Sequence, residues 1–315
     1  MKIVLFGGGN RGSQVLHKLL DLQQEVVGVS YFDEDSHEEV WYEKIQDIAA
    51  ENRIPCSNHR SIRGNILSSL SSPEIVLVVG WRYKIEKDQY SVPPRGCIVL
   101  HDSLLPKYRG FAPMNWAIIN GEKKTGVTMF YIADDIDAGD IIAQKETSID
   151  ATDDVETLDR KITCLYLELI EENLPLIADG RAPRTSQDHS KATYTCKRIP
   201  EDGLIQWSRP ASEIHNLIRG VTRPYPGAFT FVRTSIGVEK LYVWSASLPS
   251  IQEAYVGYVP GRVVEILEGR GVKVLADDGT TLVLEDVELE TQKKRVKADQ
   301  VQVLRSVKTT LGTYA

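Results

Sequence analysis

The chain has 315 residues, long enough for two domains, with 42% hydrophobic and 26% charged residues, as in soluble globular proteins. Its formal net charge of −7 argues against a nucleic-acid binder, which usually has a basic surface. No apolar run could span a bilayer, and the first residues indicate a strand rather than a signal peptide. Four scattered cysteines lack disulfide or metal spacing, so we expect reduced thiols, a cytoplasmic protein and no metal site.

The first half of the chain alternates short apolar strands with amphipathic helices. We expect strands at residues 2–6, 25–31, 75–80, 97–100 and 126–132. We expect helices at residues 13–21, 41–51, 112–120 and 153–174, the last of them ended by Pro175. This alternation predicts an α/β fold, a Rossmann-like and mostly parallel sheet that is covered on both faces.

The second half has a different pattern. Polar and turn residues between positions 178 and 202 are typical of a linker between domains. After a helix at 210–220, short alternating segments predict strands at 228–232, 240–244, 261–267, 272–276 and 281–287. Closely spaced strands of this kind predict a small antiparallel β-barrel that is OB-like. We therefore expect a catalytic domain over 1–190, a linker over 191–205 and the barrel over 206–315.

A glycine-rich turn follows the first predicted strand. Residues 7–12, GGGNRG, match the dinucleotide fingerprint G-x-G-x-x-G, and Asp33 lies about 20 residues further on. The motif is compatible with an NAD(P)-dependent enzyme. It is equally compatible with the tight turn that any such sheet needs between its first strand and first helix.

His101 lies at the exit of the strand at 97–100, and Pro106 and Gly110 predict a loop after it. Histidine moves protons near neutral pH, so this position suits acid–base chemistry. The loop after the strand at 126–132 contains Asp137. Ligands of open α/β sheets bind beyond the carboxyl ends of the strands, so the two side chains can meet there if their strands are neighbours. The alternative is an isolated loop histidine and a surface acid.

Long stretches resemble the folate-dependent formyltransferases, a family that includes methionyl-tRNA formyltransferase and the nucleotide-sugar N-formyltransferases. They are HDSLLPKYRGFAPMNWAIINGEKKTGVT from His101 and DAGDIIAQ from Asp137, and their 36-residue interval agrees with the family pattern N-x-H-x-S-L-L-P-x-x-R-G followed by D-x-G. The likeness continues through VTRPYPGAFTFV at 221–232 and PGRVVEIL at 260–267. It is greatest for the nucleotide-sugar enzymes, such as the formyltransferase domain of the bifunctional polymyxin-resistance enzyme.

The resemblance implies transfer of a formyl group from N10-formyltetrahydrofolate to a primary amine. His101 would be the general acid and base, and Asp137 would orient its ring. The segments that match folate-binding parts of the family contain Trp81, Tyr83, Lys84, Ile85, Ala133, Asp134, Asp135 and Ile136. The residues that could contact a phosphorylated sugar substrate are Asn10, Arg11, Ser103, Lys107 and Arg109.

One position departs from the family. The asparagine two residues before the catalytic histidine is replaced by Val99, which cannot donate a hydrogen bond to an oxyanion. Charged His101 could act alone, or Ser103, Asn115, a backbone amide or water could substitute. The remaining readings are a slow enzyme or an inactive folate- or sugar-binding homologue.

Methionyl-tRNA formyltransferases resemble each other in a basic insertion soon after the second strand. The matching stretch here, residues 31–43, contains six acidic residues and neither lysine nor arginine. Such a stretch repels a polyanion, which favours a nucleotide-linked amino sugar for surface glycan synthesis over the alternative, formylation of Met-tRNA. We expect a small-molecule substrate and neither a nucleic acid nor a membrane as partner. A homodimer would be unsurprising.

Overall fold

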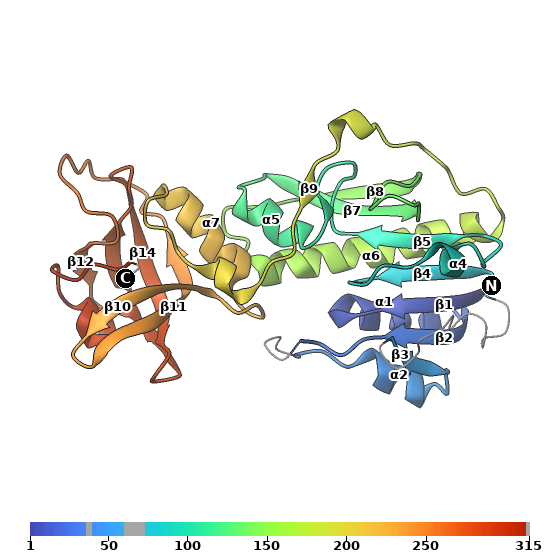
Figure 1. Cartoon of the computed structure of the whole chain (residues 1–315), viewed down its shortest axis with the longest axis horizontal. Coiled ribbons are helices and arrows are strands. Elements are labelled where there is room, and N and C mark those ends of the chain that lie inside the picture. The colour runs from blue at the N-terminus through green and yellow to red at the C-terminus, as the bar shows by residue number, and fades with distance from the viewer. Residues whose placement is uncertain (36–39, 60–72, 313–315) are drawn as a thin grey trace. The chain divides into compact units, whose positions relative to one another are not determined.

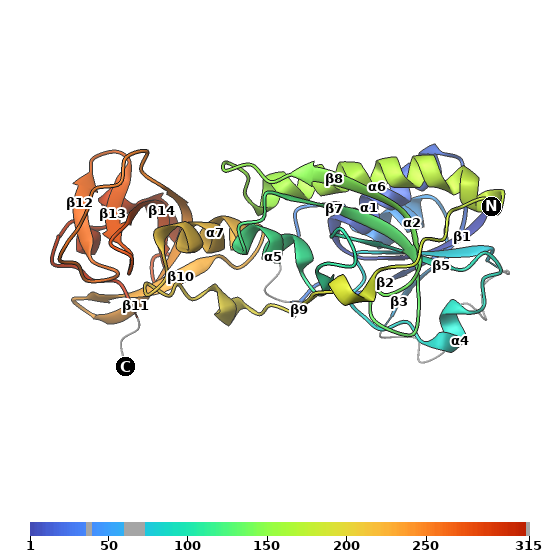
Figure 2. The ribbon, with the colours of Figure 1, turned by 90° about the horizontal axis from the view of Figure 1, so that it is seen from above.

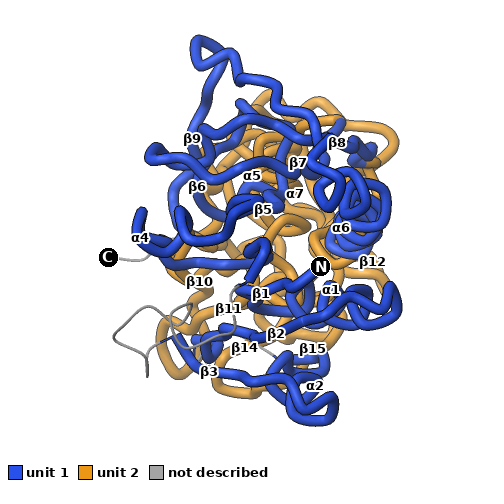
Figure 3. Tube along the Cα trace, turned by 90° about the vertical axis from the view of Figure 1, so that its right-hand side faces the viewer, with its two compact units in different colours: residues 1–114, 124–149, 158–197 blue, residues 115–123, 150–157, 198–315 orange. Residues whose placement is uncertain are grey.

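The computed structural model in Figure 1 describes residues 1–35, 40–59 and 73–312. It divides into two compact units, which Figure 3 colours separately. The first comprises residues 1–114, 124–149 and 158–197, and the second comprises residues 115–123, 150–157 and 198–315. Residues 36–39 of the predicted acidic stretch lie outside the described residues. In the described ranges, no helix combines the length and apolar character needed to cross a membrane.

The first unit contains a seven-stranded sheet with the order β3-β2-β1-β4-β5-β7-β8. The first five of these strands are parallel, and β7 and β8 are antiparallel to their neighbours. The mostly parallel sheet is therefore confirmed. The strands are β1 (Lys2–Gly7), β2 (Glu25–Tyr31), β3 (Cys56–Asn58), β4 (Ile75–Val79), β5 (Cys97–His101), β7 (Lys124–Tyr131) and β8 (Ile141–Ser148).

Helices cover both faces of this sheet. Figure 2 shows α1 and α6 on one face and the short α4 on the other. On the α4 side, Val4, Phe6 and Val78 form a buried cluster with Ile85 and Cys97. The pleat sends alternate residues of the same strands to the opposite face. The helices are α1 (Gly9–Asp21), α2 (Ile45–Glu51), α4 (Lys87–Tyr90), α5 (Pro113–Ile119) and α6 (Val155–Ala178).

Pro175 does not end α6, contrary to our prediction. It lies inside the helix, which continues to Ala178. Proline lacks the N–H that would reach the carbonyl of Glu171, but both residues are exposed, so water can satisfy that carbonyl. The helix instead ends before Gly180, whose φ of +69° suits a helix C-terminus.

The second unit contains α7 (Ala211–Val221) and a six-stranded antiparallel sheet with the order β10-β11-β14-β13-β12. The five strands predicted in this region are confirmed, and a sixth strand, β15, was not predicted and pairs with β14. Their apolar side chains form one buried core with α7. The strands are β10 (Ala228–Thr234), β11 (Gly237–Ser247), β12 (Val263–Leu267), β13 (Gly271–Leu275), β14 (Thr281–Leu289) and β15 (Lys294–Lys297).

The C-terminal segment links the two ends of this sheet. Thr310 bridges Arg262, next to β12, and Gly312 bridges Phe231 in β10. The backbone N–H of Gly312 donates to the carbonyl of Phe231 at 3.1 Å, and the N–H of Val263 donates to that of Thr309 at 3.0 Å. Both edge strands are covered in this way, which gives the small barrel that the sequence predicts.

Candidate active site

The end of β5 positions His101. Alternation along the strand places Val99 and His101 on the same face, and the side chain of His101 is 11% exposed. Its Nε2 lies 2.8 Å from the carbonyl oxygen of Tyr108. A carbonyl can only accept, so Nε2 carries a proton. Nδ1 lies 3.7 Å from Oδ2 of Asp137, so the two residues expected to meet do lie together.

Asp137 reaches His101 by a route that we did not predict. Strand β7 is antiparallel to β5, so its last residue, Tyr131, pairs with Ile98 near the amino end of β5. His101 lies at the other end of β5. The loop after β7 therefore starts at the end of the strands that is far from His101, and it must run back along the sheet to bring Asp137 to His101. The backbone N–H of Gly110 donates to Oδ2 of Asp137 at 2.7 Å and holds the carboxylate at the end of this return.

Thr128 fixes the loop that follows His101. Its buried hydroxyl donates to the carbonyl of Ser103 at 2.6 Å and accepts from the N–H of Leu105 at 3.1 Å. Nε2 of Gln144 donates both to this hydroxyl and to the carbonyl of Leu105, at 2.8 Å each. These bonds give the loop one conformation. The sequence indicated neither Thr128 nor Gln144, since both occur in an ordinary alternating pattern.

Burial argues against two of the predicted substrate contacts. Ser103 is 2% exposed, and its hydroxyl donates to the carbonyl of Lys107 at 2.8 Å. Arg109 is also 2% exposed, and its Nη2 donates to Oε1 of Gln187 at 2.6 Å. Both side chains support loops instead of facing solvent. Lys107 is exposed, and its contact with a phosphate stays a prediction.

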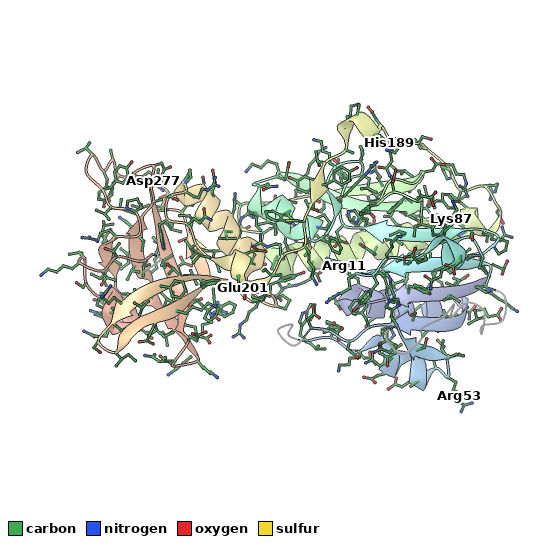
Figure 4. All side chains as sticks on the ribbon, viewed as in Figure 1. Arg11, Arg53, Lys87, His189, Glu201 and Asp277 are labelled. Atoms are coloured by element: carbon green, nitrogen blue, oxygen red, sulfur yellow. The ribbon has the colours of Figure 1, made fainter. Side chains whose placement is uncertain are left out.

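Arg11 is labelled in Figure 4, and its guanidinium faces two carboxylates. Its Nη1 lies 2.6 Å from Oδ2 of Asp102, and its Nη2 lies 2.7 Å from Oδ1 of Asp159. Asn10 also approaches Asp159, at 3.4 Å. The Tyr166 hydroxyl donates to Asp102 at 2.5 Å, and burial holds the pKa of Tyr166 well above its usual value. A phosphate would have to compete with both carboxylates, which argues against the predicted phosphate contact of Arg11 and Asn10.

Gly7 and Gly8 of the GGGNRG turn lie in close packing. A Cβ atom on Gly8 would lie 2.2 Å from the ring of Phe32 and 2.9 Å from the carbonyl oxygen of Gly80. A Cβ atom on Gly7 would lie 2.5 Å from Ile45. The tight-turn reading of the motif therefore accounts for these glycines, and Phe32 lies against the turn where a dinucleotide would need free backbone.

Aromatic rings gather after β4. The Trp81 ring lies 5.1 Å from Phe6 and 5.5 Å from Phe32, and Tyr83 stacks on His59 at 4.5 Å. His59 was not among the predicted site residues, and burial lowers its pKa. Nε1 of Trp81 is buried and has no hydrogen-bond partner among the described residues. Of the other predicted folate contacts in this segment, Ile85 is in the core and Lys84 is exposed.

The other predicted folate segment, residues 133–136, lies mostly in solvent. Asp135 is exposed, and Ile136 is 63% exposed. Asp134 pairs with Lys87 at 3.1 Å and accepts a hydrogen bond from Tyr90. The bond from Tyr90 lowers the pKa of Asp134, and the same bond raises the pKa of Tyr90 to about 12. Ala133 is half-buried at the start of the segment.

Two family models match most of the chain. Residues 1–172 match the model described as formyl transferase, and residues 198–302 match the formyl transferase C-terminal domain.

Solved structures with the same fold are distant in sequence. An N-formyltransferase from Helicobacter canadensis in complex with folinic acid and dTDP-3-aminofucose is 20% identical, with a TM-score of 0.67 over 90% of this chain and 98% of that one. WlaRD, a sugar 3N-formyl transferase in the presence of dTDP and 5-N-formyl-THF, is 22% identical, with a TM-score of 0.64 over 92% and 98%. A methionyl-tRNA formyltransferase from Clostridium thermocellum is 19% identical, with a TM-score of 0.52 over 79% and 94%.

Proposed function

The chain belongs to the formyl transferase family, and on that premise we propose that it transfers a formyl group from N10-formyltetrahydrofolate to the primary amine of a nucleotide-linked amino sugar. The observation that carries this proposal is the imidazole of His101, held between the Tyr108 carbonyl and the Asp137 carboxylate. The expected pathway is surface glycan synthesis in the cytoplasm.

The residues after β4 fit a folate. A pterin is a flat ring with several hydrogen-bond acceptors, and Nε1 of Trp81 is a buried donor that has no hydrogen-bond partner among the described residues. Trp81 and Tyr83 would hold the ring, with Ile136 as an exposed apolar contact. The folate supplies the formyl group when bound. Two enzymes that share the fold were crystallised with folates: the Helicobacter canadensis enzyme with folinic acid, and WlaRD in the presence of 5-N-formyl-THF.

His101 can accept and then return the proton that moves during the reaction. At 3.7 Å, the contact between Nδ1 and Asp137 is too long for a hydrogen bond, so Nδ1 stays available to accept a proton. The amine loses a proton as its nitrogen bonds to the formyl carbon, and Asp137 stabilises the charged ring that results. The same ring can return this proton to the leaving nitrogen.

Val99 leaves few donors for the oxyanion. The hydroxyl of Ser103 is engaged with a backbone carbonyl, and Nδ2 of buried Asn115 donates to the carbonyl of Gly220 at 2.9 Å. The N–H of Gly110 is used by Asp137. Of the substitutes considered for the family asparagine, charged His101, another backbone amide and water are left. We propose that charged His101 serves as this donor.

The charges near β2 favour a sugar nucleotide over a tRNA. The described part of residues 31–43 presents Asp33, Glu34, Asp35 and Glu43, and it contains no lysine or arginine. A tRNA requires many phosphate contacts, whereas a sugar nucleotide has two phosphates. Met-tRNA is the alternative substrate, since an enzyme for it shares this fold.

The direct test is to incubate the protein with N10-formyltetrahydrofolate and a panel of nucleotide-linked amino sugars and to follow product mass. We expect one amino sugar to gain a single formyl group. Formylation of Met-tRNA instead would replace the substrate that we propose. No product from any amine would overturn the function.

Substitutions of His101 and Asp137 test the roles proposed for these two residues. His101→Asn and Asp137→Asn should each lower kcat by about 10²–10⁴, the usual contribution of a positioned acid–base group, without loss of thermal stability. His17→Asn is the matched control, because His17 is 45% exposed on α1 and pairs with Glu43. Near-normal rates for both active-site variants would contradict the assignment.

A further inference from the structure

The loop that carries Asp137 has little packing of its own. Asp134, Asp135 and Ile136 are all exposed. Asp137 has a φ of +49°, in the left-handed region, which aspartate adopts more readily than most residues but still seldom. Contacts from other segments must therefore hold its backbone.

Gln187 supplies those contacts from the segment that we expected to lead into the linker. It is 6% exposed, and its Nε2 donates to the carbonyls of Asp137 and Gly139 at 2.8 Å each. Only Ala138 separates the two carbonyls. One carboxamide thus holds both sides of the turn.

Arg109 fixes the orientation of that carboxamide. Its Nη2 donates to Oε1 of Gln187 at 2.6 Å, which leaves Nε2 directed at the two carbonyls. Arg109 is 2% exposed, and no carboxylate of the described chain lies within ion-pair distance of it. Its other acceptors are neutral, namely the hydroxyl of Tyr194 at 3.3 Å and Nδ1 of His189 at 3.1 Å. His189 is labelled in Figure 4. A buried cation with so few acceptors depends strongly on each one.

The loop that carries Arg109 also holds the carboxylate of Asp137. Gly110 follows Arg109 directly, and its N–H donates to Oδ2 at 2.7 Å. Two consecutive residues of the His101 loop therefore control Asp137, one through Gln187 at the backbone and one directly at the side chain. The position of Asp137 relative to His101 follows from both contacts.

We infer that Gln187, oriented by Arg109, is a positioning residue that keeps the Asp137 carboxylate beside His101. The inference rests on the proposed function, in which this carboxylate stabilises the charged ring. The 3.7 Å contact has no hydrogen bond of its own to restore it after a displacement. A misplacement of about 1 Å can lower a rate about 10²-fold.

Gln187→Glu separates positioning from stability. Glutamate has the same size and keeps an acceptor for Arg109, to which it adds a counter-charge, but it loses both N–H donors. The new ion pair with Arg109 offsets the repulsion between the second carboxylate oxygen and the two carbonyls, so we expect thermal stability close to that of the wild type. We expect kcat to fall about 10- to 100-fold while KM stays nearly unchanged, because the lost contacts act on the transition state. Amide hydrogen exchange over residues 133–140 should become faster.

Gln302→Glu makes the same charge change at an exposed position of the second unit and should alter none of these quantities. The inference is wrong if Gln187→Glu keeps the wild-type kcat and exchange rates, or if the variant loses stability despite its new ion pair. A wild-type protein without transferase activity would overturn the proposed function alone. The exchange rates would then still show whether Gln187 holds the loop.

Discussion

His59 should make the stability of the first unit depend on pH. Burial lowers its pKa below the usual 6.5, so between these two values the unfolded chain binds more protons than the folded one. Stability should be complete above about pH 6.5 and decrease as the pH falls through this window. His59→Phe keeps a ring on Tyr83 and removes the titration, so its urea midpoint should change less between about pH 7.5 and about pH 5.5.

His215 in the second unit has its pKa lowered in the same direction, by burial and by Arg219, so part of the pH dependence should remain in the variant. A pH dependence in His59→Phe equal to that of the wild type would show that the charge on His59 does not affect folding.

At the residue scale, the sequence identified side chains by type and could not show their surroundings. His101 and Asp137 were predictable because they occur at a fixed interval in a long motif. Arg11 and Arg109 were expected to contact phosphate because they are basic, yet one faces two carboxylates and the other is buried. Gln187 gave no signal, since its role depends on a backbone turn 50 residues away.

At the element scale, the β6–β9 pairing depends on Gly110. The two short parallel strands are β6 (Arg109–Gly110) and β9 (Tyr194–Thr195), and β9 lies within the predicted linker. Gly110 has a φ of +101°, and an added Cβ would lie 2.6 Å from the carbonyl oxygen of Thr195. Gly110→Ala should therefore destabilise the protein by about 1–3 kcal/mol and lower activity, because the strained residue also holds Asp137.

Gly180→Ala is the control for that change. Gly180 also has a positive φ, +69°, but no atom of the described chain lies within 4 Å of an added Cβ. It should show the cost of the left-handed conformation without the collision. The measurement is the free energy of unfolding in urea for both variants. Equal losses would mean that the close approach to Thr195 contributes nothing.

The sequence predicted the existence of elements better than their direction or ends. The apolar run at 126–132 indicated a strand, but nothing in it shows that β7 runs antiparallel to β5. Strand β15 is Lys-Arg-Val-Lys, which has too few apolar residues to be recognised as a strand. We predicted that Pro175 ends α6 because proline cannot donate the helical hydrogen bond. In the exposed last turn water can take the place of that bond, so the helix continues past Pro175.

At the scale of the whole molecule, two sequence patterns were sufficient to predict the fold class. They are the alternation of strands and helices in the first half and the closely spaced strands of the second half, and each extends over more than 100 residues. The boundaries at 190 and 205 stay a prediction. The second unit includes residues 115–123 and 150–157, which lie far from residue 198 in sequence. Helices α5 and α6 begin in one unit and end in the other, a division that local composition cannot show.

The C-terminal segment packs into the barrel of the second unit and pairs with its strands. Leu311 is 1% exposed, and its N–H donates to the carbonyl of Gly261 at 2.8 Å, beside the bridges that cover β10 and β12. A chain ending at Lys308 should lose about 2–5 kcal/mol through removal of this buried leucine alone. It should also expose two strand edges and aggregate at lower concentration.

A chain ending at Gly312 keeps every one of these contacts and is the matched control. Urea unfolding followed by tryptophan fluorescence should report the loss, because Trp207 and Trp244 are both buried in this unit. Equal unfolding midpoints for the two truncated chains would contradict a closing role for residues 309–312. The barrel would then be held by its six strands, with their edges tolerant of solvent.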